Sequence, residues 1–153
     1  MTGTVIGILG LALCMILCGT GSAIGLYMAG SAASGVIGED GKKFSKVFVL
    51  AVLPATQGIY GFVISIIGIT NVAAIASLPV AEQLSAGINV LMATLPMTIV
   101  GFISAFFQGR TSVAAINAVA KDDSVSGKMI LFPAMVETYA ILALVITIML
   151  LGI

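Results

Sequence analysis

The chain has 153 residues, of which 60% are hydrophobic and only 8% charged, and six basic residues balance six acidic ones. A soluble domain carries about a quarter charged residues, so this composition excludes a soluble globular protein and indicates an integral membrane protein. No stretch is polar for long enough to form a separate soluble domain, so we expect one membrane domain over residues 1–153. We expect no nucleic-acid partner and no organic cofactor.

Four apolar segments predict four transmembrane helices, because each exceeds the roughly 20 residues that a helix needs to cross a bilayer. They cover residues 5–33, 47–76, 84–119 and 129–151. The first lacks the basic region that precedes a cleaved signal peptide, so we expect it to remain as a permanent helix. Cys14 and Cys18, one turn apart within it, are expected to be small apolar residues on a packing face rather than a metal or redox pair.

The basic residues predict the orientation of the chain. All lie in the first or third connection between segments, or near that end of the third segment: Lys42, Lys43, Lys46, Arg110, Lys121 and Lys128. The positive-inside rule therefore predicts that loops 38–46 and 121–128 are cytoplasmic and that both termini lie on the opposite side of the cell membrane. We interpret Arg110 as a residue that extends to the cytoplasmic edge, with a counter-ion role as the alternative.

The sequence contains an internal repeat. Pro54 and Tyr60 match Pro133 and Tyr139 at a spacing of 79, and Ser22-Ala23 matches Ser104-Ala105 at a spacing of 82. The chain therefore resembles two tandem helical hairpins of the same orientation, repeat one at about 1–76 and repeat two at about 84–153. The copies differ at one telling position, where Gly58 in the first stands in place of Glu137 in the second.

Stripes of small residues mark the first and third segments. The first contains Gly21 and Gly25 as a GxxxG pair, and the third contains Gly101 and Ala105 one turn apart. Small residues let membrane helices approach closely. We expect these two segments to pack tightly, as the inner helices of a ring with the second and fourth segments outside; ordinary packing within one bundle is the alternative.

Glu137 lies within the fourth apolar segment, where a charged side chain costs about 2.5–3.5 kcal/mol on insertion scales. The other polar side chains within the apolar segments that draw attention are Thr56, Gln57, Tyr60 and Gln108. From the helical rise, Gln57, Gln108 and Glu137 reach similar depth. Pro54 and Pro133 free backbone carbonyls because neither can donate to the residue four positions back.

Such a group is an all-oxygen cage with a single negative charge. It suits Na⁺, because a divalent ion would usually require more carboxylates and a proton would require fewer oxygens. For the neutral side chains, hydrogen bonding between helices is the alternative interpretation.

Three motifs together resemble the K subunit, the duplicated c-type proteolipid, of bacterial V-type rotary ATPases. They are LPATQGIY at 53–60, FQG at 107–109 and PAMVETYAIL at 133–142, and the similarity extends over nearly the whole chain and is closest to the sodium-pumping members. The resemblance implies an all-α membrane protein of four transmembrane helices that assembles into a rotor ring. It implies a non-catalytic subunit of an ATP-driven ion translocase, since ATP is hydrolysed in a separate soluble sector.

The resemblance also implies a set of sodium ligands, a hydrogen bond from Tyr60 to Glu137, and several partners. The ligands would be the backbone carbonyl of Leu53 and the side chains of Thr56, Gln57, Gln108 and Glu137. The partners would be further copies of the chain, a membrane stator subunit with a basic residue, the central-stalk subunits and lipid. A rotor ring that carries H⁺ is the main alternative; a small multidrug exporter would require aromatic walls that this chain lacks, and Glu137 argues against a purely structural proteolipid.

Overall fold

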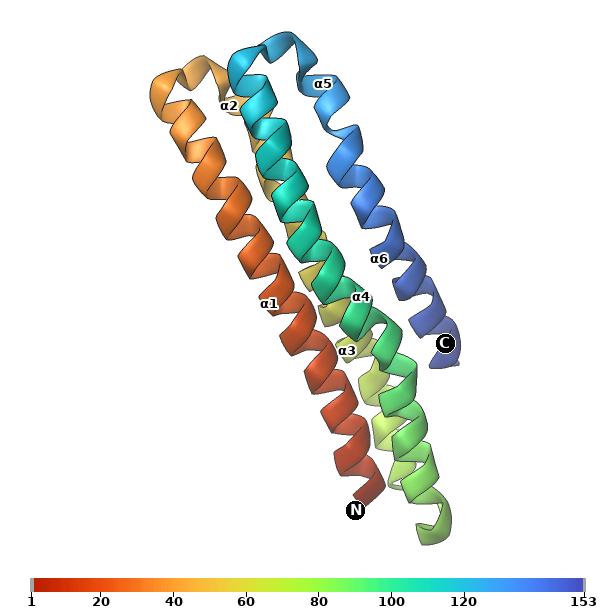
Figure 1. Cartoon of the computed structure of the whole chain (residues 1–153). Coiled ribbons are helices and arrows are strands. Elements are labelled where there is room, and N and C mark those ends of the chain that lie inside the picture. The colour runs from red at the N-terminus through yellow and green to blue at the C-terminus, as the bar shows by residue number, and fades with distance from the viewer. Residues whose placement is uncertain (1, 153) are drawn as a thin grey trace.

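The computed structural model describes residues 2–152, and these fold into a bundle of long helices that run alongside one another (Figure 1). In that view α4 lies between α1 and α6, with α3 behind it. The helical elements, in chain order, are α1 (Thr2–Glu39), η1 (Gly41–Lys43), α2 (Phe44–Val52), η2 (Leu53–Ala55), α3 (Thr56–Ile75), α4 (Val80–Lys121), η3 (Asp123–Val125), α5 (Ser126–Met129) and α6 (Leu131–Leu150).

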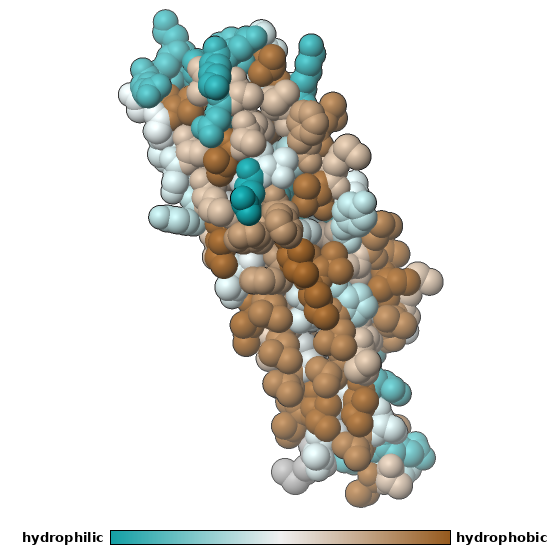
Figure 2. All heavy atoms as spheres, viewed as in Figure 1, coloured by the Kyte–Doolittle hydropathy of each residue, from teal (hydrophilic) through white to brown (hydrophobic). Residues whose placement is uncertain are grey.

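The prediction of four membrane-spanning segments is confirmed. Four helical stretches are long and apolar enough to cross a bilayer: Thr2–Glu39, Gly41–Ile75, Val80–Lys121 and Asp123–Leu150. Hydrophilic residues gather at the two ends of the molecule, and mainly hydrophobic residues cover the band between them (Figure 2). The chain is therefore a multi-pass membrane protein with all-helical architecture in its described part.

All four spans are longer than the hydropathy pattern predicts. The first reaches Glu39 rather than 33, and the second begins at Gly41 rather than 47. The polar loop residues continue the helices because Asp40 accepts a hydrogen bond from the Lys42 amide at 3.0 Å and so caps the turn that restarts the chain. Hydropathy reports apolar length only, whereas caps decide where a helix ends.

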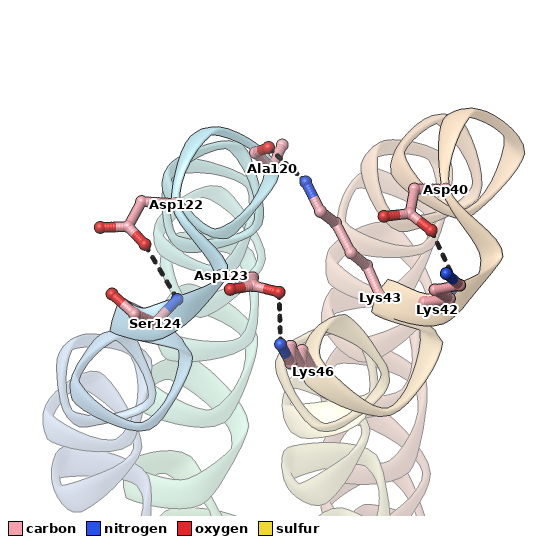
Figure 3. Close-up of polar contacts among 8 residues, drawn as sticks. All are labelled: Asp40, Lys42, Lys43, Lys46, Ala120, Asp122, Asp123 and Ser124. Carbon is pink, nitrogen blue, oxygen red and sulfur yellow. Dashed lines mark hydrogen bonds and ion pairs between the residues drawn. The ribbon is translucent and has the colours of Figure 1, made fainter.

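The two lysine-containing loops lie side by side and are bonded to each other (Figure 3). Lys43 Nζ donates to the carbonyl of Ala120 at 2.6 Å and so caps the C-terminus of α4, while Lys46 forms an ion pair with Asp123. Asp122 caps η3 by accepting from the Ser124 amide at 3.0 Å. Hydrogen bonds from the Ser124 side chain and amide hold the pKa of Asp122 below its ordinary value. The contacts of Lys43 and Lys46 hold the two hairpins together at one end of the bundle.

The closest helix pair is α1 and α4, as the small-residue stripes predict. A Cβ built on Gly109 would lie 2.5 Å from the Cα of Gly25, and one built on Gly87 would lie 2.0 Å from the carbonyl oxygen of Gly3. The two backbones therefore touch, which only glycine permits at these points. Cys14 and Cys18 are both fully buried along this part of the bundle, in agreement with their predicted role as packing residues.

Two prolines mark the distorted points of the second and fourth spans. Pro54 lies in the 3₁₀ turn η2 between α2 and α3, and Ile130 interrupts the helix three residues before Pro133. The caps Asp40 and Asp122 are 82 residues apart, whereas the prolines are 79 apart. The second repeat is thus three residues shorter between cap and proline, which is about 4.5 Å of helix.

The last helix, α6, packs against α4 and less against α3, and its apolar side chains are the most exposed of the four spans. It ends at Leu150, before Gly152 with a φ of 73°, and the carbonyl of Leu151 accepts from the side-chain amide of Asn71 at 2.7 Å. Asn71 on α3 therefore fixes the end of α6. Glu137 lies on α6, about halfway along the fourth span, Asp123–Leu150.

Candidate functional site

The polar residues predicted from separate segments come together in one hydrogen-bonded chain. It crosses from α3 through α4 to α6 and ends on the half-buried carboxylate of Glu137. Its members are Thr56, Gln57 and Tyr60 on α3, Gln108 on α4, and Glu137 on α6. Three helices that are distant in sequence thus meet at one depth, as the helical rise predicts.

Two glutamines form the centre of the site. Gln57 and Gln108 are both fully buried, and the amide nitrogen of Gln57 donates to Oε1 of Gln108 at 2.6 Å. The amide nitrogen of Gln108 in turn donates to Oε2 of Glu137 at 3.3 Å. Buried amides without partners would each cost about 1–3 kcal/mol, so the network stabilises the position of both side chains.

The carboxylate of Glu137 is half-buried at the surface of α6. Its Oε1 accepts from the Tyr60 hydroxyl at 2.8 Å, and its Oε2 accepts from Gln108. Both oxygens are therefore held by donors on other helices. Such charge-assisted hydrogen bonds fix the direction of the carboxylate and offset the cost of removing it from water.

The first turn of α3 supplies two more oxygens. The Thr56 hydroxyl lies 3.2 Å from the carbonyl oxygen of Leu53 and 3.3 Å from Oε1 of Gln57. The 3₁₀ geometry of η2, next to Pro54, brings this carbonyl beside the side chain of Thr56. All six residues singled out from the sequence thus lie in one cluster.

One member of the site was missed by the sequence analysis. Gln108 also donates to the carbonyl of Pro133 at 3.1 Å, so the second proline contributes its own oxygen. The prediction that each proline frees the carbonyl four residues earlier pointed to a different atom. The signal for this contact in the sequence was Pro133 itself, which lies one turn before Glu137.

The surroundings of Gly58 explain why only the second hairpin has a carboxylate at this position of the repeat. The Gly58 amide donates to Oγ of Ser22 at 2.7 Å, and a Cβ on Gly58 would lie 3.2 Å from that same side chain. In the first hairpin α1 therefore packs where the second hairpin has the side chain of Glu137. The two hairpins have the same topology, but they differ in what occupies the position beside Gly58 and Glu137.

Arg110 does not pair with Glu137. It lies two residues after Gln108 on α4, which is about 200° around a helix, and its side chain is exposed. Within residues 2–152 the one ion pair joins Lys46 to Asp123, so the counter-ion alternative finds no support. The same part of the chain contains no group of three acidic, cysteine or histidine side chains that could hold a metal. The site is one carboxylate among neutral oxygens.

Fold and site together define a class: a four-span proteolipid built from two hairpins, with one carboxylate held between helices in the membrane. The family model that describes the C subunit of ATP synthase matches the chain twice, over residues 9–68 and 91–150. These two matches cover most of the chain, one in each hairpin.

Two characterised relatives agree with this match. The chain is 39% identical over 148 residues to the V-type sodium ATPase subunit K of Enterococcus hirae, covering 97% of this chain and 91% of the relative. It is 35% identical over 147 residues to the A-type ATP synthase subunit K of Methanocaldococcus jannaschii, covering 96% of this chain and 62% of the relative. The chain belongs to the family of ATP synthase C subunits. It is a K-type rotor subunit of a rotary ATPase and does not itself catalyse ATP hydrolysis.

Proposed function

We propose that this rotor subunit binds one Na⁺ per chain at Glu137 and transports it across the membrane as a ring of such subunits turns. The observation that carries the proposal is the convergence of Gln57, Gln108 and Glu137 from three helices. A proton carrier needs the carboxylate and one hydrogen-bonding partner. Two fully buried glutamines beside that carboxylate are better explained by a cation that exchanges its water shell for protein oxygens.

The ligands that we propose are neutral except for one. They are the carbonyl of Leu53, the hydroxyl of Thr56, the amide oxygens of Gln57 and Gln108, and a carboxylate oxygen of Glu137. The Gln57 amide nitrogen lies 2.6 Å from Oε1 of Gln108, and this oxygen has a second lone pair that can bind a cation. Tyr60 donates to Oε1 of Glu137 and Gln108 donates to Oε2, so a bound ion would share a carboxylate oxygen with one of these donors or displace it.

Occupancy then gates rotation through electrostatics. With a bound cation the carboxylate is neutralised, so α6 can face lipid at low cost. Without the cation the charge costs several kcal/mol in lipid. The empty carboxylate therefore stays near an aqueous half-channel or a basic residue of a stator subunit. This difference makes rotation of a subunit into lipid depend on whether its site is loaded.

We propose the orientation and partners from the same elements. The lysine-rich loops face the cytoplasm, where they contact central-stalk subunits, and both termini lie on the opposite side. The contacts between the loops join the two hairpins at this end, so a stalk subunit would meet one surface built from both. We also propose that the whole chain acts as one membrane domain of two repeats, at about 1–76 and 84–153.

Protection against a carbodiimide tests the sodium assignment. The purified protein is labelled at Glu137 over a range of pH, in NaCl or in choline chloride of the same ionic strength. A bound Na⁺ occupies the carboxylate, so NaCl should slow labelling at every pH where the site is loaded. Glu137→Gln should abolish the label, and Glu82→Gln, at an exposed carboxylate near the start of α4, should leave it unchanged.

The same experiment distinguishes the two ions. If labelling is equal in NaCl and choline chloride at all pH values, and falls only as pH rises, the ring carries H⁺ and the sodium assignment is wrong. The relative from Enterococcus hirae is a sodium ATPase subunit, which favours slower labelling in NaCl.

A further inference from the structure

A groove of about 290 Å³ lies between α4 and α6, and all the residues that line it belong to these two helices. Its lining is almost wholly apolar and carries no charge, so it offers nothing to a charged partner. The lining residues are Val100, Ile103, Ser104, Phe107, Val136 and Tyr139. Ile103, Phe107 and Tyr139 are large side chains that the chain itself leaves exposed.

The internal repeat gives the counterpart of this groove in the first hairpin. The offsets of 82 for α4 and 79 for α6 convert its lining into Cys18, Gly21, Ser22, Gly25, Gln57 and Tyr60. This counterpart lies against the second hairpin. Cys18 donates to the Met97 carbonyl, and a Cβ added to Gly21 would lie 3.2 Å from the Cβ of Ala105. In the first hairpin the equivalent surface is therefore covered by α4.

The exposed face of α1 has the matching relation to α4. Where α4 packs on α1, its buried residues include Gly87, Ala105 and Gly109. Their counterparts 82 residues earlier are all exposed: Val5, Ala23 and Tyr27. Because α4 lies between α1 and α6, one copy carries a groove on one side and the face that fits it on the other (Figure 1). Two different surfaces that fit each other join copies head to tail, which gives a ring when the rotation closes.

We propose that this groove receives α1 of the next copy in the register of the repeat. The contact of Gly21 with Ala105 within the chain then becomes a contact of Ile103 with Ala23 of the next copy. The occupant is a second copy, because its α1 face is the repeat equivalent of the α4 face that fills the matching groove. The inference rests on the ring in the proposed function and names the residues that join its copies. It does not depend on the ion carried.

The contact between copies differs from its equivalent within the chain at the depth of the ion site. Gly25 touches Gly109 in the chain, but their counterparts are Phe107 and Tyr27 of the next copy. Backbones that carry two aromatic rings between them cannot touch, so the inner helices of adjacent copies lie further apart there than α1 and α4 do. The rings fill the space and bury apolar surface, which stabilises the contact. Phe107 directly precedes Gln108, so the aromatic pair is level with the proposed ligands.

Disulfide cross-linking in membranes tests the register. Full-length protein that carries both Ile103→Cys and Ala23→Cys is oxidised with copper phenanthroline and separated by denaturing electrophoresis. A disulfide needs Cβ atoms about 3.5–4.5 Å apart, so this variant should form a ladder of multimers. Pairing Ile103→Cys with Ile16→Cys moves the second thiol two turns along the same face of α1, about 10 Å, and should leave monomers. Each single variant controls for the buried Cys14 and Cys18.

The stability of the ring tests the aromatic contact. Tyr27→Ala should lower the temperature at which purified rings dissociate, as followed by native mass spectrometry. Tyr27→Phe keeps the aromatic ring and should leave that temperature unchanged. Equal dissociation temperatures for Tyr27→Ala and the wild type would overturn this part of the proposal.

The cross-linking outcomes also separate the register from the ring itself. Monomers from the variant with Ile103→Cys and Ala23→Cys, in a sample whose rings are intact, overturn the register and leave the ring standing. A dimer from Ala23→Cys alone also overturns it, because α1 would then face α1 across a two-fold axis. Absence of rings in the wild type would instead contradict the ring of the proposed function, and this contact with it.

Discussion

Tyr60 and Tyr139 are equivalent residues of the two repeats, yet their surroundings differ completely. The Tyr60 hydroxyl donates to Glu137 at 2.8 Å, whereas Tyr139 is 67% exposed. The residue type alone therefore does not define a site residue. What distinguishes Tyr60 is that the carboxylate of the other hairpin lies across from it.

We expect Tyr60→Phe to weaken sodium binding roughly ten- to a hundredfold, because it removes one hydrogen bond to a charged group, worth roughly 1.5–3 kcal/mol. The carboxylate would then move more freely and be less well directed at the ion. The measurement is the NaCl concentration that halves the rate of carbodiimide labelling of Glu137.

Tyr139→Phe is the matched control, since it removes the same atom from the equivalent position without touching the site. Its half-protecting NaCl concentration should equal that of the wild type. Equal values for both variants would show that the Tyr60 hydroxyl does not support ion binding.

At the scale of helices, the pairing of α1 with α4 depends on glycines whose neighbours leave no room. Gly109 lies against the Gly25 backbone, with 2.5 Å to Cα and 2.8 Å to the carbonyl oxygen for an added Cβ. Backbone atoms cannot move aside as a flexible side chain can. The spacing of the two longest helices is therefore set at such points.

We expect Gly109→Ala to destabilise the protein by about 1–3 kcal/mol, the usual cost of an overpacked contact. Gly35→Ala, on α1 with no atom within 4 Å of the added Cβ, should instead be neutral or stabilising by up to about 1 kcal/mol through helix propensity. Thermal unfolding in detergent, followed by circular dichroism, compares the two. A melting temperature for Gly109→Ala at or above that of the wild type would contradict the packing argument.

The helices and most of the site follow from sequence patterns, because each depends on local chemistry. Hydropathy predicts the four spans, and the depths of Gln57, Gln108 and Glu137 predict that they meet. The carbonyl of Pro133 and the bond from Lys43 to Ala120 were not predicted. Both are side-chain contacts to backbone atoms of a distant segment, and their geometry depends on how the helices are packed.

At the scale of the whole molecule, the two hairpins have retained a common topology while only one retains a polar site. The spacing of 79 relates Thr56 and Gln57 to Met135 and Val136, and the spacing of 82 relates Gln108 to Leu26. The side chains of Thr56, Gln57 and Gln108 thus have apolar counterparts in the other repeat, and the neighbour of Gly58 is Ser22. The duplicated chain has one carboxylate and one set of ligands for it.

This asymmetry predicts that a second carboxylate will not create a second ion site. In Gly58→Glu the new side chain meets Ser22, 3.2 Å from the added Cβ, in place of amide oxygens. A charge in the membrane without such partners costs about 2.5–3.5 kcal/mol, so the variant should be less stable and still bind one Na⁺ per chain. Equilibrium binding of radioactive sodium, normalised to protein, measures the number of ions.

Two control variants separate charge from volume. Gly58→Gln has nearly the same shape without the charge, and Gly58→Ala adds only the Cβ, which Ser22 can accommodate with a shift of a few tenths of an ångström. If Gly58→Glu loses more stability than Gly58→Gln, the unpaired charge is responsible rather than crowding. Two sodium ions per chain in Gly58→Glu would mean that a lone carboxylate suffices for binding. The buried glutamines would then have to be reinterpreted as hydrogen-bonding contacts between helices.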